Sequence, residues 1–350
     1  MKIAIINNKQ AARKELIRVV TLTGQHELAW STSSGERAID FCQAVRPDLI
    51  LMDPLVRDRD GIQVIRQIMA KSPCAILIVT GSVEQRSDIV FDAMGAGAID
   101  AVDTPILNTT AYHQAEQVLL RKIAMIELLT RDSQQPPADV TDGSLNPLNR
   151  PAHDNLVIIG CSSGGPEALA RLLSDLPQGF QSPVVVIQHV DAAFATGLAK
   201  WLNVKSALPV KLIEDGDQPL PGKVLLAATN RHLVMSPDGY LKYSQDPTDT
   251  FYRPSVDVFF RSVAKNWPYS VTAILLTGMG KDGANGMLEL RQKGACTIAQ
   301  DEATSAVYGM PKAAVELGAA TEILPIDRIA DVLVSNHTAG ATLGVALSES

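Results

Sequence analysis

Short apolar runs alternate with longer amphipathic segments along the first part of the chain. Each apolar run has the length of a buried strand, and each amphipathic segment repeats its apolar residues at helical spacing. Strand–helix units joined by short links predict a parallel sheet with helices on both faces. The predicted strands are residues 2–6, 28–31, 49–52, 75–79 and 98–102, and the predicted helices are residues 11–22, 35–45, 62–69, 85–94 and 110–129.

This pattern stops at about residue 130 and is absent over residues 131–154. The stretch includes Gln-Gln-Pro-Pro at 134–137 and has no apolar period. Proline and polar residues in this mixture predict an extended linker. We therefore expect a first domain at residues 1–130 and a linker at residues 131–154.

A second α/β pattern begins after the linker and predicts a doubly wound domain at residues 155–336. We also expect an antiparallel insertion around residues 223–243 and a flexible tail at residues 337–350. The predicted strands are residues 156–159, 184–188, 210–213, 223–227, 232–235, 270–276 and 297–299, and the predicted helices are residues 166–176, 194–204, 256–266, 285–293 and 326–334.

Composition narrows the class of protein. Of the 350 residues, 46% are hydrophobic and 20% charged, which is ordinary for a globular chain. A net charge of -7 without a lysine or arginine cluster argues against a nucleic-acid partner. The amino-terminal apolar run is too short for a signal peptide, and no run approaches the roughly 18 apolar residues of a membrane span. We expect a cytoplasmic protein without membrane insertion, whose four scattered cysteines are reduced.

Three residues with complementary chemistry follow predicted strands of the second domain. Ser162 lies in a glycine-rich turn, His189 directly follows its strand, and Asp282 lies in a loop after another strand. The carboxyl ends of parallel strands share one edge, where active sites form. Histidine can take the proton that makes serine nucleophilic, and a carboxylate orients the imidazole. Together the three residues predict acyl transfer at this edge.

Each residue also has a simpler interpretation when it is taken alone. Ser162 and Asp282 both fit helix N-caps, and His189 fits a core histidine that closes a strand. In addition, residues 278–283 read Gly-Met-Gly-Lys-Asp-Gly, which matches the G-x-G-x-x-G pattern of dinucleotide-binding domains. Asp301 follows the next strand, where such domains place the acidic residue that binds the ribose. A dinucleotide-binding enzyme that uses the segment from Gly278 to Gly283 therefore stays open as an alternative.

Five motifs follow in order along the chain. They are Ile-Gly-Cys-Ser-Ser-Gly-Gly-Pro-Glu-Ala-Leu at 159–169, Gln-His at 188–189, Arg-Pro-Ser-Val-Asp at 253–257, Leu-Thr-Gly-Met-Gly-Lys-Asp-Gly at 276–283, and Gln-Asp-Glu at 300–302 with Tyr-Gly-Met-Pro at 308–311. This set resembles the chemotaxis-type protein-glutamate methylesterases. That family joins a flavodoxin-like receiver with a five-stranded parallel sheet to a methylesterase domain.

The resemblance implies a role for each candidate residue. Ser162 would be the nucleophile, His189 the general base and Asp282 its orienting carboxylate, while backbone near Ser163 and Met279 would form the oxyanion hole. The implied reaction removes methyl groups from glutamyl esters on chemoreceptors and releases methanol, with glutamine deamidation as a second activity. It needs no cofactor. The implied partners are a methylated chemoreceptor or a related sensory array protein, and a sensor histidine kinase.

The resemblance extends to the first domain, where Asp53 would accept a phosphoryl group and Thr80 would supply the switch hydroxyl. Asp58 and Asp60 follow in the usual loop. Two departures concern the metal and the phosphoryl group. Asn7 and Asn8 replace the usual acidic pair, which leaves Asp53 as the one expected carboxylate ligand for Mg²⁺. Thr104 stands where receivers place a lysine.

Two alternatives for this domain follow from the departures. Either phosphorylation of Asp53 is weak or absent, or a relaxed site still accepts a phosphoryl group. We expect the receiver to restrain the esterase in either case. A receiver adaptor without catalysis is a further alternative, against which the intact triad argues.

Overall fold

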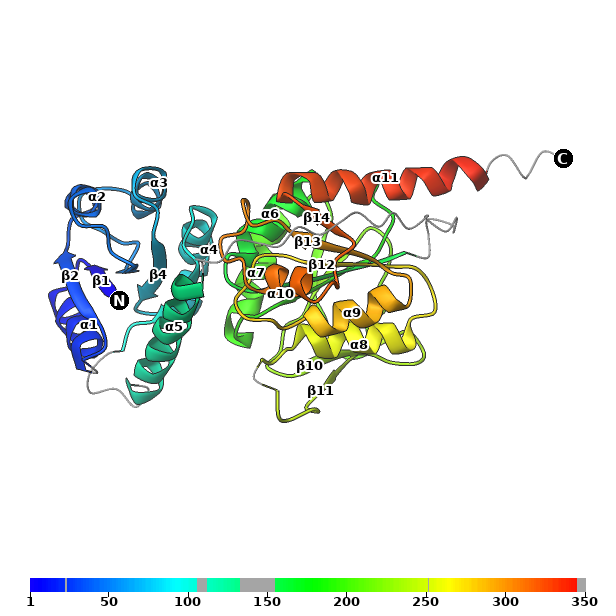
Figure 1. Cartoon of the computed structure of the whole chain (residues 1–350), viewed down its shortest axis with the longest axis horizontal. Helices are drawn as coiled ribbons and strands as arrows, with labels where there is room; N and C mark the ends of the chain where they lie inside the picture. The colour runs from blue at the N-terminus through cyan, green and yellow to red at the C-terminus, as the bar shows by residue number, and fades with distance from the viewer. Residues whose placement is uncertain (23, 106–111, 133–154, 251, 345–350) are drawn as a thin grey trace. The chain divides into compact units, whose positions relative to one another are not determined.

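The computed structural model describes residues 1–22, 24–105, 112–132, 155–250 and 252–344, and it divides into two compact units, Met1–Pro137 and Ala138–Ser350 (Figure 1). Of the predicted linker, only Arg131 and Asp132 are described, as the end of the helix that closes the first unit, and residues 133–154 lie outside the described residues.

The first unit is a five-stranded sheet in the order β2-β1-β3-β4-β5, and every strand pair is parallel. Its strands are β1 (Lys2–Ile6), β2 (Glu27–Thr32), β3 (Leu49–Met52), β4 (Ala75–Thr80) and β5 (Asp100–Asp103). The central strands β1, β3 and β4 are almost fully buried because both faces of the sheet are covered. Asn7, Asp53 and Thr80 lie at the carboxyl ends of these three strands, so the sheet gathers them at one edge.

Helices cover both faces of this sheet (Figure 1). Helices α1 and α5 lie on one side, joined by an ion pair between Arg18 and Glu116, and α2 and α3 lie on the other. The helical elements are α1 (Gln10–Leu22), α2 (Gly35–Ala44), α3 (Gly61–Lys71), the 3₁₀ turn η1 (Glu84–Arg86), α4 (Ser87–Gly95) and α5 (Tyr112–Asp132). The alternating pattern predicts this parallel sheet with helices on both faces, and the resemblance implied the five-stranded receiver.

The second unit is built on a seven-stranded parallel sheet in the order β14-β13-β12-β6-β7-β9-β8. Its strands are β6 (Leu156–Cys161), β7 (Val184–Gln188), β8 (Val210–Leu212), β9 (Val224–Leu226), β12 (Val271–Leu275), β13 (Cys296–Gln300) and β14 (Glu322–Leu324). The hairpin β10 (His232–Met235) and β11 (Leu241–Ser244) is antiparallel and forms a separate sheet. Because β6 lies between β7 and β12, the loops after these three strands share one edge.

Two groups of helices enclose the larger sheet. Helices α8, α9 and α10 cover one face, and α6 and α11 lie together on the other (Figure 1). The bounds are α6 (Gly165–Asp175), α7 (Ala192–Lys205), α8 (Val256–Asn266), α9 (Ala284–Gln292), α10 (Met310–Glu316) and α11 (Ile326–Gly344). Phe259 and Phe260 of α8 are fully buried, so this helix is anchored firmly beside the edge where the candidate residues gather.

Most predicted elements are present, and three points differ. The predicted insertion began too early, because β9 joins the parallel sheet and the antiparallel part starts at β10. The short elements β14 and α10 were missed, since three and seven residues give no clear periodicity. Helix α11 continues to Gly344, so residues 337–344 of the expected flexible tail are helical.

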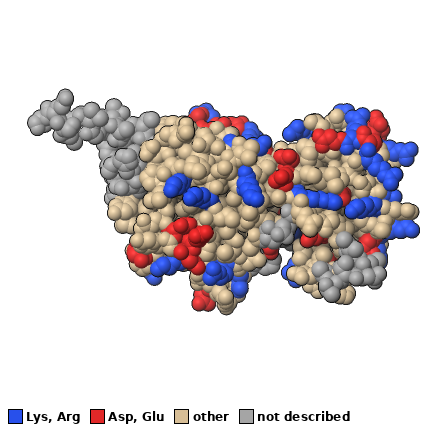
Figure 2. Space-filling view, turned by 180° about the vertical axis from the view of Figure 1, so that it is seen from behind, with Lys and Arg blue, Asp and Glu red and all other residues tan. Residues whose placement is uncertain are grey.

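The surface charges, the helix hydropathy and the cysteines can be compared with what the composition predicts. Acidic and basic side chains are interspersed on the face of each unit shown in Figure 2. Among the described helices, none combines the length and the hydropathy that a bilayer crossing requires. The cysteines Cys42, Cys74, Cys161 and Cys296 are all free, as expected.

Candidate active site

Ser162 follows β6 in the turn that leads into α6. Its amide donates to the Thr277 carbonyl over 3.1 Å, and its carbonyl accepts from Gln188 Nε2 over 2.9 Å. The N-cap of α6 is Gly164, in the left-handed region at φ +77°, and no side chain caps the helix. The N-cap interpretation of Ser162 is therefore wrong, and its hydroxyl is not committed to the helix.

Glycine is required where this turn meets the neighbouring strand. A Cβ on Gly165 would lie 2.0 Å from Gln188 Oε1, and a Cβ on Gly164 would lie 2.5 Å from the Cβ of Ala306. Any larger residue would push Gln188 away from the Ser162 carbonyl. The glycine pair thus fixes the backbone that carries the candidate nucleophile.

His189 lies beside this turn because β6 and β7 pair in parallel register. Cys161 is opposite Gln188, and the His189 amide donates to the Cys161 carbonyl over 3.0 Å. Ser162 and His189 are each the first residue beyond this pair of positions. Strand register alone therefore brings the hydroxyl-bearing and the imidazole-bearing residues to adjacent places.

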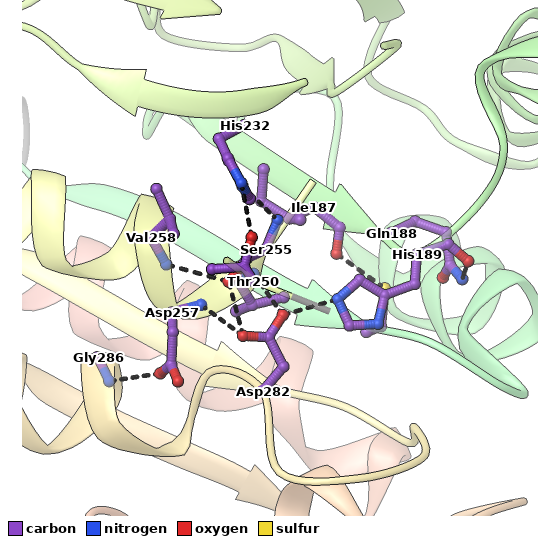
Figure 3. A network of polar contacts seen from close by, with 12 residues as sticks. Ile187, Gln188, His189, His232, Thr250, Ser255, Asp257, Val258, Asp282 and Gly286 are labelled. Carbon is purple, nitrogen blue, oxygen red and sulfur yellow. Dashed lines mark hydrogen bonds and ion pairs between the residues drawn. The ribbon is translucent and has the colours of Figure 1, made fainter. Parts of the chain in front are cut away.

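Asp282 reaches the histidine from the loop after β12 (Figure 3). Its Oδ2 lies 2.8 Å from His189 Nε2. An ionised carboxylate only accepts, so Nε2 carries the proton and Nδ1 keeps its lone pair. Nδ1 is buried and has no hydrogen-bond partner among the described residues, so the contact from Ser162 to His189 is not made. Catalytic hydrogen bonds often tighten only when substrate binds, and His189 keeps a free lone pair at the strand end adjacent to that of Ser162.

The amino end of α8 holds the Asp282 carboxylate (Figure 3). Oδ1 accepts from Ser255 Oγ over 2.8 Å and from the Asp257 amide over 3.1 Å, and Oδ2 accepts from the Val256 amide over 2.7 Å. Burial raises the pKa of Asp282, but the hydrogen bond and charge of His189 and the donors of α8 outweigh burial and hold this pKa below its ordinary value. The N-cap of the following helix is Gly283, so the N-cap interpretation of Asp282 for that helix is wrong.

Two rings in this site were not singled out from the sequence. Tyr252 stacks on His189 with centroids 4.3 Å apart and planes 4° from parallel. His232 is fully buried and accepts the Ser255 amide at Nδ1 over 3.2 Å, while its Nε2 faces the Pro247 carbonyl at 3.1 Å. Burial lowers the pKa of His232, which keeps the ring neutral and able to accept at Nδ1. Both rings come from the hairpin and the loop after it, where no periodicity marks them. Ser255 had a local signal, since a serine before an apolar helix is an N-cap pattern.

The backbone near Ser163 and Met279 lines the same turn. The Ser163 carbonyl accepts from Thr277 Oγ1 over 2.9 Å, which fixes that peptide. Within the described part of the chain, neither the Ser163 amide nor the Met279 amide donates to another group. Two free N–H groups in this position suit a developing negative charge.

The glycine loop at residues 278–283 packs against Ser162. A Cβ on Gly278 would lie 2.9 Å from the Ser162 Cβ, and the Gly278 amide donates to the Val307 carbonyl over 3.0 Å. Gly280 and Gly283 lie at φ +81° and +93°, which lets the loop turn back so that Asp282 meets His189. These glycines serve the close approach of the loop to the serine, and the dinucleotide alternative is not supported.

The first unit gathers the other candidate residues around Asp53, which is 3% exposed. Arg86 Nη1 lies 3.8 Å from Asp53 Oδ2 and donates to Thr80 Oγ1 over 2.7 Å. The Thr104 amide donates to the Thr80 carbonyl over 2.7 Å. Burial raises the pKa of Asp53 more than the positive charges of Arg86 and Lys9 lower it. Arg86 was not predicted, and only its place in the loop after β4 could have suggested it.

Asp58 and Asp60 do not join this cluster. Asp58 accepts from Ser34 Oγ over 2.6 Å and from the Gly35 amide over 2.8 Å at the start of α2. The hydrogen bond from Ser34 leads the contacts that lower the pKa of Asp58 to about 2. Asp60 is the N-cap of α3. Both carboxylates therefore cap helices.

The fold and the site define a serine hydrolase joined to a receiver. The family model described as CheB methylesterase matches residues 157–333, and that of the response regulator receiver domain matches residues 3–115. The chain belongs to the CheB methylesterase family.

Known relatives match along nearly the whole chain. Protein-glutamate methylesterase/protein-glutamine glutaminase 2 of Burkholderia lata is 50% identical over 97% of this chain and 98% of its own length. The corresponding protein of the group 3 operon of Pseudomonas putida is 47% identical over 94% of this chain and 97% of its own. The crystal structure of the Thermotoga maritima CheB methylesterase catalytic domain has 37% identity, covers 52% of this chain and 97% of its own, and has a TM-score of 0.49.

Proposed function

We infer that this chain is a receiver-regulated serine esterase that hydrolyses glutamyl methyl esters on chemoreceptor proteins. The observation that carries this function is the contact between Asp282 and Nε2 of His189, which leaves the buried Nδ1 atom without a hydrogen-bond partner among the described residues, at the end of the strand next to the one that leads to Ser162. The full-length relatives named protein-glutamate methylesterase/protein-glutamine glutaminase support the same substrate class.

The reaction begins when Ser162 Oγ attacks the ester carbonyl carbon. His189 Nδ1 takes the hydroxyl proton, and Asp282 stabilises the resulting imidazolium. The carbonyl oxygen becomes an oxyanion, for which the free amides of Ser163 and Met279 are the available donors. His189 then returns the proton to the methoxy oxygen, methanol leaves, and a glutamyl ester of Ser162 remains.

Water completes the cycle by the reverse sequence of proton transfers. His189 Nδ1 removes a proton from the water, which attacks the acyl carbon, and Ser162 recovers its proton as the glutamate is released. A glutamine side chain enters the same sequence with ammonia as the leaving group. Deamidation therefore needs no residue beyond those of the esterase, and neither activity requires a cofactor.

The partners follow from the same inference. The substrate is a methylated chemoreceptor or a related sensory array protein, and a sensor histidine kinase supplies the signal that the receiver reads. These partners and the chain would meet in the cytoplasm. A non-catalytic adaptor has no need of a nucleophile, a base and an orienting carboxylate. The presence of Ser162, His189 and Asp282 therefore favours the esterase over the adaptor.

Methanol release from a methylated receptor tests this function. Ser162→Ala should lower the rate at least about a thousandfold, because no other hydroxyl occupies the nucleophile position. Ser174→Ala is a matched control, since Ser174 is exposed on α6 and its hydroxyl donates to the Arg171 carbonyl. Unchanged release by Ser162→Ala would refute the proposed function.

A further inference from the structure

Positive charge lies near the buried carboxylate of Asp53. Arg86 lies 3.8 Å from the carboxylate, and Lys9 acts on it through space. Arg13 donates to the Asn7 carbonyl over 2.7 Å at the end of the neighbouring strand. The Asp53 amide donates to the Ile6 carbonyl over 2.9 Å, which sets Asp53 beside Asn7. One buried carboxylate thus lies close to the guanidinium of Arg86 and within the electrostatic influence of Lys9.

Asn7 adds a donor beside Asp53. It is 1% exposed, and its Oδ1 accepts the Lys9 amide over 2.9 Å. That bond fixes the orientation of the amide, because the flipped form would bring two donors together. The Nδ2 group is left buried without a partner among the described residues. A buried donor of this kind calls for an acceptor, which an oxyanion would supply.

The same residues do not fit the Mg²⁺ ion that the receiver fold implies. A hard divalent cation needs several oxygen ligands with compensating negative charge. Asp58 and Asp60 are used in helix capping, and Asn8 leaves one neutral, unpartnered oxygen, Oδ1. Across the described residues, no group of three His, Cys, Asp or Glu side chains could hold a metal. A divalent cation at Asp53 would also meet the guanidinium of Arg86.

We propose that the cluster of Asp53, Arg86 and Asn7 accepts and holds a phosphoryl group without a divalent cation, and that Arg86 supplies the charge that a metal would otherwise provide. The ionised carboxylate of Asp53 attacks the phosphorus of an acyl phosphate or phosphohistidine donor. A bond forms between the Asp53 oxygen and phosphorus as the bond from phosphorus to the donor breaks, and the donor leaves with that electron pair, as acetate when acetyl phosphate is used. Arg86 and Asn7 Nδ2 then bind the phosphoryl oxygens.

This proposal goes beyond the esterase function and does not depend on it. The reaction at Ser162 occurs in the other unit, so methanol release tests one proposal and modification of Asp53 tests the other. Arg86 already binds the Thr80 hydroxyl. A phosphoryl group on Asp53 would compete for that guanidinium and would release Thr80, which gives the receiver a change to transmit.

The test is acetyl phosphate treatment of the full-length protein, followed by intact-mass measurement. Parallel samples contain excess EDTA or millimolar Mg²⁺, and Asp53→Asn shows which mass gain belongs to this residue. The expected result is an Asp53-dependent gain whose rate is equal, within about twofold, in EDTA and in Mg²⁺. A gain that appears only with Mg²⁺ would overturn the proposal, and so would the absence of any gain.

Variants of the cationic residue sharpen the test. Arg86→Ala should slow the modification at least about tenfold, as expected for loss of a charge-assisted hydrogen bond, and Arg86→Lys should recover part of it. Arg59→Ala is the matched control, because Arg59 pairs with Glu36 at the surface over 3.0 Å. The double variant Asn7→Asp with Arg86→Ala exchanges a cation for a carboxylate and should make the reaction depend on Mg²⁺.

Circular dichroism of each variant separates a folding defect from a binding defect. An Arg86→Ala protein that folds normally and is modified at the wild-type rate would overturn the role of Arg86. Continued independence from Mg²⁺ in the folded double variant would also contradict it.

Discussion

At the scale of single residues, the site is organised around the tautomer of one histidine. Asp282 binds Nε2 of His189, so the proton is held there and the lone pair is at Nδ1. Asp282 is itself held by donors from the start of α8 and has little freedom to rotate. The ring is covered on one face by Tyr252. Two contacts therefore orient the imidazole: Asp282 binds its edge, and Tyr252 packs on its face.

Tyr252 is expected to act as a positioning residue through this stacked contact. Tyr252→Ala should lower kcat about three- to tenfold, because an aromatic stacking contact contributes about 0.5–1.5 kcal/mol. Tyr252→Phe keeps the ring and should retain most of the activity. Steady-state methanol release provides kcat and KM for both variants. A rise in KM with unchanged kcat in Tyr252→Ala would instead assign the ring to substrate binding.

The low pKa of Asp282 predicts how stability depends on pH. A carboxylate whose pKa is lower in the folded state stabilises the fold fully above about pH 4, and this contribution is lost as pH falls through the folded value. Asp282→Asn should cost about 2 kcal/mol at pH 7, and the difference from wild type should shrink as the solution is acidified below pH 4. Urea unfolding at a series of pH values measures this difference. Asp327→Asn, at an exposed ion pair, should show almost no cost. A cost for Asp282→Asn that stays constant down to pH 2 would contradict the argument.

At the scale of elements, the amino end of α8 links helix capping to catalysis. Ser255 is the N-cap of α8, where it accepts the Val258 amide over 3.3 Å, and its hydroxyl donates to Asp282. The buried ring of His232 holds the Ser255 amide from behind. The helix start is therefore fixed on both sides, and its first turn presents donors to the triad carboxylate.

Ser255→Ala should affect stability and catalysis together. Loss of the cap should cost about 1 kcal/mol, and loss of one Asp282 donor should lower kcat about tenfold. Ser34→Ala is the matched control, because Ser34 caps α2 in the other unit by accepting the Arg37 amide over 3.1 Å. It should cost similar stability and leave the kcat of the esterase unchanged. Equal effects of the two substitutions on kcat would contradict a specific role for Ser255.

Some elements and contacts of the active site could be predicted from the sequence, and others could not. Buried parallel strands have continuous apolar runs, so the strands that precede Ser162, His189 and Asp282 could be predicted, and the shared edge followed from the topology rule. The stacking of Tyr252 could not be predicted, since it depends on how a loop with no periodicity returns to the sheet. Arg86 lies within the predicted helix 85–94, and its approach to Asp53 is set by the tertiary structure, which helical periodicity does not reveal. The short strand β14 forms only because it pairs with β13, which is information from the tertiary structure.

At the scale of the whole molecule, the proposed catalytic residues all belong to one unit. Ser162, His189 and Asp282 lie in the unit Ala138–Ser350, together with every donor that binds Asp282. The receiver unit has its own sheet and its own buried core. The proposed chemistry uses only described residues of this unit, so we expect the receiver to act by changing access to the site or its activity.

Removal of residues 1–137 should therefore leave a folded and active esterase. The receiver is expected to restrain the site. If it does, the truncated protein should release methanol faster than the full-length chain, because the receiver can no longer limit access of substrate to the active site. The measurement is the initial rate of methanol release at equal molar enzyme concentration, with circular dichroism as the check on folding. Ser162→Ala in the truncated protein is the control, and it should be inactive. A folded truncated enzyme with the same rate as the full-length chain would show that the receiver does not restrain this active site, and a lower rate would indicate that it activates the esterase instead.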